Sequence, residues 1–230
     1  MPTRTRLERR GKNFRKIAQL IDTTKNYSLE EAVLLAKQTN TAKFDSTVEL
    51  HVRLGVDPRQ ADQNIRDNLI LPAGTGRKVR VAVFDDASAP DADISGVEVI
   101  TKLLEKSQLD FDVLIASPAQ MPKLGKYARL LGPRGLMPNP KSGTVTTDIA
   151  KAVAEAKAGR VEYRVDSTGI IHIGVGKVSF DAAKLAENIQ AVLASLKANK
   201  PASVKGVYFK SAYLATTMGP SIALSLTSIG

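Results

Sequence analysis

Few residues of this 230-residue chain belong to types that perform covalent or metal chemistry. Cysteine is absent, which excludes disulfides, thiol nucleophiles and Cys-based zinc sites. The two histidines, His51 and His172, lie far apart in sequence, so we expect no histidine-rich metal site. The sequence also lacks the Gly-x-Ser-x-Gly motif of serine hydrolases. We therefore predict no catalytic residue, no bound metal and no cofactor.

Two glycine-rich segments have the composition of phosphate-binding loops but not their pattern. Gly74-Thr75-Gly76 precedes a predicted strand instead of following one, and Val79 stands where a dinucleotide loop has its third glycine. In the segment 132–145, Pro140 precedes Lys141 and removes a backbone N–H that a Walker loop needs. We interpret this segment mainly as a rigid structural loop that also presents its arginine and lysine to phosphate.

Positive charge is the strongest compositional feature, with a formal net charge of +10 and an isoelectric point near 9.8. The first sixteen residues carry a net +6, and residues 113–147 include no acidic residue. One basic cluster is equally consistent with a solvated surface, whereas two favour a polyanionic partner. The cations of the two segments are Arg4, Arg6, Arg9, Arg10, Lys12, Arg15 and Lys16, and then Lys123, Lys126, Arg129, Arg134 and Lys141.

The hydropathy pattern predicts no membrane-spanning segment and no secretory signal. The longest apolar stretch, near residues 214–226, is interrupted by polar residues, glycine and proline. The first sixteen residues are basic without an apolar core, and Glu8 argues against a mitochondrial transit peptide.

The first third of the chain predicts a basic arm, a helix and a strand. Residues 1–26 form the arm, and Ser28 with Glu31 has the spacing of a capping box that begins a helix. Apolar residues alternate with polar ones from Val48 to Leu54, as in a half-buried strand. Residues 55–78 predict a long loop with a short apolar patch.

The middle of the chain alternates strands and helices. Compact apolar segments at 79–84 and 112–116 predict strands, and helical spacing occupies 94–106, 121–131 and 149–158. Gly159 stands in the C′ position of the last helix. This alternation is typical of an α/β unit with a partly parallel sheet.

The last third returns to antiparallel patterns. Strands at 161–165 and 170–173 flank a turn at 166–169, which predicts a hairpin. Asp181 is expected to cap a helix with Phe180 and Leu185 as a hydrophobic staple, and strands follow at 206–216 and 221–226. One apolar face of that helix consists of Leu185, Ile189, Val192 and Leu196.

The lone strand near residue 50 needs partners, which the strands after residue 160 can supply. We therefore predict a discontinuous terminal domain, 1–73 with 159–230, and an inserted domain, 74–158. A single continuous α/β domain is the alternative.

Several motifs together resemble one known family. They are the segment Leu131–Val145, Thr41–Glu49, Gly55–Arg59, Asp166–His172 and Thr216–Ser221. In this order and spacing they closely resemble bacterial ribosomal protein L1, over nearly the whole chain. The resemblance implies two domains: an antiparallel split-sheet α/β sandwich, and a Rossmann-like α/β domain inserted into it.

The resemblance also implies a function and partners. Proteins of this family are cytoplasmic, non-enzymatic and ribosome-bound. Their terminal domain binds large-subunit ribosomal RNA at the mobile stalk beside the exit site, where deacylated tRNA leaves. They typically repress translation of their own mRNA, and we expect a monomer off the ribosome.

The family's RNA-binding positions can be transferred to this chain residue by residue. On residue type alone Phe44 and Met218 would be assigned to the core, whereas the resemblance makes them RNA contacts. The transferred positions are Lys43, Phe44, Thr47, Glu49, Arg53, Asp166, Thr168, Ser211, Thr217, Met218 and Gly219.

Three features depart from the family pattern. Ser167 stands where Lys or Arg is common, which removes a phosphate contact, and Gly174 stands where Pro is usual. Between Phe84 and Asp93 the chain is shorter than typical, so a helix of the inserted domain is expected to be trimmed or missing.

Two functions of other classes compete with RNA binding. One is a small nucleotide-binding enzyme that uses the middle domain. The other is a structural interaction protein whose basic patches serve solubility. Nucleotide-dependent thermal stabilisation would favour the first, and co-purifying RNA would count against the second.

Overall fold

The computed structural model describes residues 10–85, 91–107 and 109–226. The chain divides into two compact units. The discontinuous unit comprises residues 1–76 and 163–230, and the continuous unit comprises residues 77–162.

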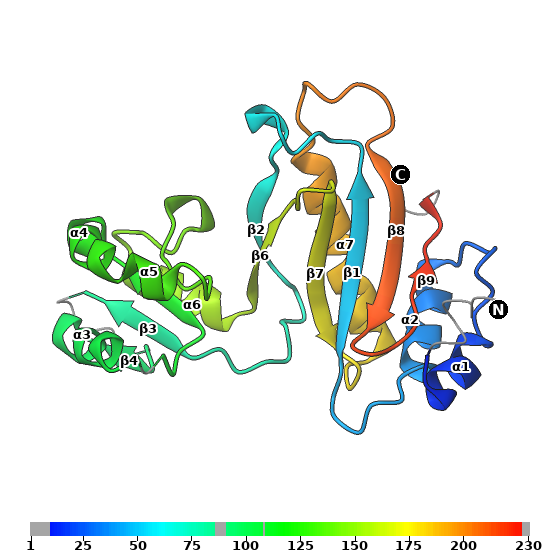
Figure 1. Cartoon of the computed structure of the whole chain (residues 1–230), viewed down its shortest axis with the longest axis horizontal. Helices are drawn as coiled ribbons and strands as arrows, with labels where there is room; N and C mark the ends of the chain where they lie inside the picture. Colours follow the sequence, from blue (N-terminus) through cyan, green and yellow to red (C-terminus); the bar gives the residue numbers. More distant parts are fainter. Residues whose placement is uncertain (1–9, 86–90, 108, 227–230) are drawn as a thin grey trace, which may run out of the picture. The chain divides into compact units, whose positions relative to one another are not determined.

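The discontinuous unit is built on a four-stranded antiparallel sheet of order β7-β1-β8-β9 (Figure 1). The strands are β7 (Ile170–Lys177), β1 (Thr47–Leu54), β8 (Phe209–Thr216) and β9 (Ile222–Ala223). The strand predicted near residue 50 thus finds its partners after residue 160, as expected from the sequence.

Helices α2 (Leu29–Gln38) and α7 (Ala182–Ala198) pack on one face of this sheet, α7 against β7 and α2 against β8 and β9. Val48, Leu50, Val52 and Leu54 of β1 point into the resulting core. The predicted apolar face of α7, Leu185, Ile189, Val192 and Leu196, is fully buried there. Because side chains alternate along a strand, the other residues of β1 lie on the opposite face, which we call the open face.

The helix starts follow the sequence signals in part. The Ser28 hydroxyl accepts from the Glu31 N–H, and the Glu31 carboxylate accepts from the Ser28 N–H, so the predicted capping box is present. Asp181 occupies the N-cap of α7, but its side chain accepts no capping hydrogen bond there. The sequence therefore predicted correctly where α7 begins, but the Asp181 carboxylate does not cap it with a hydrogen bond.

The predicted hairpin at 161–173 is corrected by the strand pairing. The turn itself forms, since the Asp166 N–H donates to Ile170 O at 2.9 Å. Beyond it β6 (Arg160–Arg164) pairs with β2 (Arg66–Ile70), while β7 pairs with β1. Strand β2 lies in the segment 55–78 that was expected to be a loop, together with the 3-10 turn η1 (Ala61–Gln63).

The helix α1 (Lys12–Ala18) lies in the predicted basic arm, and each of its residues is at least partly exposed. The arm's first nine residues, including Arg4, Arg6 and Arg9, lie outside the described residues.

The continuous unit has a three-stranded parallel sheet of order β4-β3-β5 (Figure 1). Its strands are β4 (Ile94–Ser95), β3 (Val81–Phe84) and β5 (Val113–Ala116). One face packs against α3 (Val97–Glu105), α4 (Met121–Leu124) and α5 (Ala128–Leu131), and the other against α6 (Ile149–Lys157). The predicted parallel α/β arrangement is therefore present.

Details of the continuous unit differ from the predicted elements. The expected helix at 94–106 begins with β4, and the one at 121–131 is broken into α4, the 3-10 turn η3 (Gly125–Tyr127) and α5. Gly159, with φ of 101°, ends α6 as predicted. The shortened segment between Phe84 and Asp93 has residues 86–90 outside the described part of the chain.

Candidate nucleic-acid interface

The start of β1 and the turn after β8 are joined by hydrogen bonds between Thr47 and Thr217. The Thr217 N–H donates to Thr47 O at 3.0 Å, and the Thr47 N–H donates to Thr217 Oγ1 at 3.2 Å. The Lys177 ammonium donates to Thr47 Oγ1 at 3.0 Å. These contacts connect segments 170 positions apart in sequence into one end of the sheet.

Phe44 precedes Thr47 by three positions and Met218 directly follows Thr217 in the chain, and both side chains are exposed. Phe44 is 56% exposed and Met218 is 75% exposed, so the assignment to the core that their residue types alone suggested is wrong. Both side chains are therefore accessible to a binding partner.

The turn that presents Met218 is conformationally constrained. Met218 has φ of 75°, in the left-handed region that costs a residue with a Cβ about 1–2 kcal/mol. A Cβ at Gly219 would lie 2.2 Å from Thr216 Oγ1, so only glycine fits that position. Backbone strain of this kind is concentrated at functional sites, because packing elsewhere must maintain it.

A second group of the predicted residues lies at the other end of β1. Arg53 pairs with Ser211 on β8 and with Ile170 on β7, directly after the turn that contains Asp166 and Thr168. From Thr47 to Arg53 the strand extends roughly 20 Å. The eleven transferred residues therefore form two groups, one at each end of β1.

The Asp166 carboxylate organises the turn at this second end. It accepts from the backbone N–H groups of Thr168 at 2.9 Å and Ile170 at 2.8 Å, and from the Thr168 hydroxyl. Desolvation raises the pKa of Asp166, but the hydrogen bonds from Ile170 and Thr168 outweigh it and lower the pKa to about 2. The carboxylate is thus charged at neutral pH and fixes the position of Thr168.

Three aromatic or imidazole rings connect the two groups across the open face. His51 pairs with His172 on β7 and with Tyr213 on β8, so the three residues form a row perpendicular to the strands. The transferred set omits all three. The alternation of β1 placed His51 on the polar face, but no sequence feature indicated the register that brings His172 and Tyr213 beside it.

The two histidines contact each other directly. Their Nδ1 atoms lie 2.8 Å apart, and their ring centroids 5.0 Å apart. Their separation in the sequence therefore does not keep them apart in the fold. Even so, within the described residues no group of three or more His, Asp or Glu side chains could hold a metal ion.

Carboxylates lie at the outer nitrogens of the pair. Glu49 is 3.7 Å from His51 Nε2, and Asp166 is 3.6 Å from His172 Nε2. Burial lowers the pKa of His51, and His172 lowers it further, while Glu49 raises it. The open face thus presents hydrogen-bonding rings between two groups of polar contacts.

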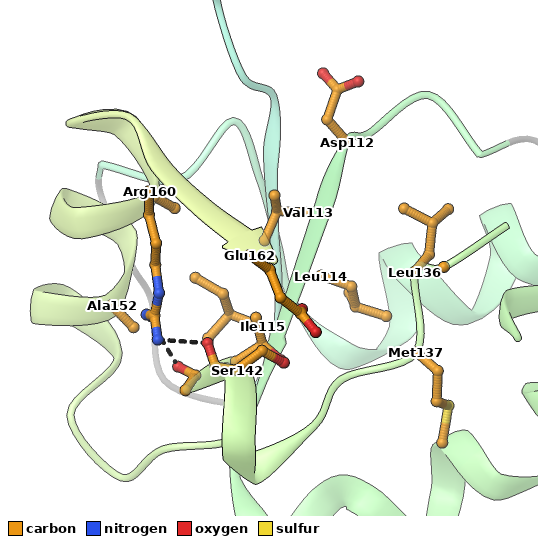
Figure 2. Close-up of a pocket in the computed structure, with 14 residues that line it drawn as sticks. Asp112, Val113, Leu114, Ile115, Leu136, Met137, Ser142, Ala152, Arg160 and Glu162 are labelled. Carbon is orange, nitrogen blue, oxygen red and sulfur yellow. Dashed lines mark hydrogen bonds between the residues drawn. The ribbon is translucent and has the colours of Figure 1, made fainter. Parts of the chain in front are cut away.

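The glycine- and proline-rich loop of the continuous unit is anchored from below by Arg160. This guanidinium, on a side chain only 12% exposed, donates to the carbonyls of Ser142 and Gly143. Figure 2 shows Arg160 directed toward Ser142. The guanidinium also pairs with Glu155 at 3.1 Å. Arg134 of the same loop is exposed. The hydrogen bonds from Arg160 therefore support the rigid, structural role that the sequence predicted for this loop.

The pocket between this loop and β5 is too small for a nucleotide. Its volume is about 140 Å³, whereas small-molecule sites typically have 300–1,000 Å³. Leu114, Leu136 and Met137 contribute apolar lining, and Asp112 and Val113 place the pocket at the start of β5 (Figure 2). Parallel α/β sheets usually bind ligands at the other end of their strands.

Comparison with known proteins decides the family. A model of the ribosomal protein L1p/L10e family matches residues 35–220. The large ribosomal subunit protein uL1 of Deinococcus radiodurans is 49% identical over 227 residues, which span 96% of this chain and 97% of that protein. The chain belongs to the L1p/L10e family. This confirms the resemblance found in the sequence motifs.

Membership of the L1 family excludes the enzyme alternative, because proteins of this family are structural and non-enzymatic. In the described part of the chain, the helices are too short or too polar to cross a membrane. The mixed α/β architecture with several sheets is compatible with the two-domain L1 fold.

Proposed function

We propose that this protein is a structural component of the large ribosomal subunit that binds ribosomal RNA through the discontinuous unit. The observation that carries the proposal is the end of the sheet around Thr47 and Thr217. There two segments far apart in sequence hold Phe44 and Met218 at the surface, and Met218 in a strained conformation.

The chemistry of this end suits RNA. Unpaired bases and riboses are recognised by stacking and van der Waals contact, which Phe44 and Met218 offer. The exposed Lys43 can contact a phosphate, and Thr217 and Gly219 bring backbone groups close to the RNA. A carboxylate such as Glu49 can accept from a 2′-hydroxyl or a base amino group.

The proposed site has two groups of residues, one at each end of β1. A folded RNA junction suits such a site, because it presents more than one stretch of backbone to a protein. Asp166, Thr168, Arg53 and Ser211 supply polar contacts roughly 20 Å from Thr47. Phosphate neutralisation should make affinity fall with salt, with a log–log slope of about −0.7 to −0.9 per contact.

The test is filter binding of large-subunit ribosomal RNA to the wild type and to Phe44→Ala and Met218→Ala. Phe44→Ala should bind roughly 5- to 150-fold more weakly, since base–aromatic contacts contribute about 1–3 kcal/mol. Met218→Ala should also weaken binding, because it removes a van der Waals contact with the RNA. Leu34→Ala is the matched control, because Leu34 is 52% exposed on α2, away from the open face.

A thermal melt of each variant shows whether the fold is kept. Unchanged RNA affinity in both variants would defeat the site assignment. Absence of RNA binding by the wild type, together with no co-purifying RNA, would defeat the function and favour a protein whose charge serves solubility.

We extend the proposal to the domain architecture. The terminal domain would comprise residues 1–73 and 159–230 as a split-sheet α/β sandwich, and residues 74–158 would be an inserted Rossmann-like domain. The four-stranded sheet covered by α2 and α7 supports the first, and the parallel sheet between α3 and α6 supports the second.

We also propose that the protein acts in the cytoplasm on the ribosome, assists release of deacylated tRNA at the exit site and represses its own mRNA. The exposed cations Lys123, Lys126, Arg129 and Arg134 of the continuous unit support contact with tRNA or stalk RNA. Direct binding of labelled deacylated tRNA tests the contact with tRNA, and competition of the protein's own leader transcript against labelled ribosomal RNA tests repression. A transcript that cannot compete would exclude repression through the ribosomal site.

A further inference from the structure

A groove runs along the open face between the helix α1 and the turn after β8. Its volume is about 610 Å³, within the range of sites that hold small organic groups. Its lining includes Phe14 and Ala18 of α1, Met218 and Gly219 of the turn, and His51 and Ala215 of the open face. None of these α1 residues belongs to the RNA contacts described above.

The lining combines apolar surfaces with a cationic and polar rim. The Arg10 guanidinium lies over the Phe14 ring at 5.2 Å from its centroid, and both residues line the groove. Thr23, His51 and Ser221 supply hydrogen-bonding groups. Of the described residues that line the groove, none is acidic.

Charge complementarity indicates what occupies the groove. Residues 10–21 carry four cations, Arg10, Lys12, Arg15 and Lys16, and no acidic residue. All seven residues of α1 are at least partly exposed, so the helix contributes little to the core. Of the four cations, Arg10 lines the groove. A flat, apolar group attached to an anion matches this combination.

We propose that the groove holds one unstacked nucleotide of the bound RNA, with its base between Phe14 and Met218 and its phosphate near Arg10. This inference rests on the proposed function and deepens it by adding the basic arm to the RNA site. Met218 would then contact this nucleotide in the groove as well as the RNA at the end of the sheet. These two contacts would account for its exposed side chain and strained backbone. His51 offers an imidazole nitrogen or ring edge to the base or ribose.

The experiment uses the full chain and an in vitro transcript of large-subunit ribosomal RNA that contains 4-thiouridine. Affinity is measured for the wild type, for Phe14→Ala and for Arg10→Ala, and crosslinked peptides are identified by mass spectrometry. Leu20→Ala is the control, because Leu20 lies in the same arm, is 58% exposed and does not line the groove.

We expect Phe14→Ala to weaken binding roughly tenfold, and Leu20→Ala to change it less than about twofold. Crosslinks should include peptides that contain Phe14 and Met218, and a melt should show that Phe14→Ala remains folded. Wild-type binding with Phe14→Ala indistinguishable from Leu20→Ala, or crosslinks confined to other peptides, would overturn the inference and leave the proposed function standing. Failure of the wild type to bind RNA would overturn both.

Discussion

His51 and His172 hold their Nδ1 atoms 2.8 Å apart, although 121 positions separate them in the chain. At this distance one nitrogen donates its hydrogen to the other, so the two rings cannot both be protonated without separating. The charged or titratable groups around the pair are Glu49 on β1, Asp166 beside β7, Tyr213 on β8 and Arg10 across the groove.

The His51–His172 contact predicts a loss of stability in mild acid. Burial and His172 lower the pKa of His51, so below the unfolded value near 6.5 the unfolded chain takes up a proton first. Unfolding free energy should therefore fall as pH drops from about 6.5 toward the lower pKa of folded His51. Urea titrations between pH 7.5 and 5 should show a smaller decline for His51→Gln, and equal declines would contradict the prediction.

The carboxylate of Asp166 predicts a second, more acidic transition. Its folded pKa of about 2 lies below its unfolded value near 3.8, so its contribution is complete above pH 4 and is lost as pH falls toward 2. Asp166→Ala should cost about 1 kcal/mol at neutral pH, since its hydrogen bonds are partly exposed to water. Asp181→Asn, at a cap without a side-chain hydrogen bond, should leave the acid-induced loss unchanged.

The strained turn predicts opposite effects of one substitution on stability and on binding. Met218→Gly removes the left-handed strain and should stabilise the protein by up to about 1 kcal/mol, reduced by the added flexibility of the unfolded chain. The same change removes a proposed RNA contact and should weaken binding. Thermal melts and filter binding on the same samples measure both, and unaltered binding with raised stability would remove Met218 from the site.

The buried amide of Asn188 predicts a loss of stability in one of the two units. Asn188 on α7 is fully buried, donates to Val175 O at 2.7 Å and Gly74 O at 3.0 Å, and accepts from the Ala73 N–H. Asn188→Ala leaves these groups without a partner and should cost roughly 2–4 kcal/mol.

If the two units unfold separately, this loss should appear only in the transition of the discontinuous unit. Gln190→Ala, at an exposed position of the same helix, should change stability by less than about 0.5 kcal/mol. A shift of both transitions by Asn188→Ala would show that the units unfold together.

Local signals in the sequence predicted local structure well. The alternation from Val48 to Leu54 gave the buried face of β1, and Ser28 with Glu31 gave the start of α2. The sequence also predicted that β1 pairs with strands after residue 160, but it predicted neither the register of that pairing nor the other strand pairs, because register is not encoded in the spacing of one segment. Strand β2, the partner of β6, and the row of His51, His172 and Tyr213 are of this kind.

The candidate site shows the same division. By residue type alone, Phe44 and Met218 were assigned to the core. The structure shows that both side chains are exposed at the surface. Resemblance to a family supplied eleven positions, but the three rings between their two groups became visible only when β7 and β8 were placed beside β1.

The central position of β1 has a consequence for the newborn chain. Both of its neighbours, β7 and β8, are encoded more than a hundred residues downstream, and β8 begins 155 positions after β1 ends. At typical synthesis rates of 5–20 residues per second, both edges of this strand stay unpaired for roughly 6–23 s until β7 is made, and the second edge stays unpaired for roughly 8–31 s until β8 is made. During that interval residues 77–162 are completed and can fold first. Until its partners are made, β1 exposes unpaired strand edges to which chaperones can bind.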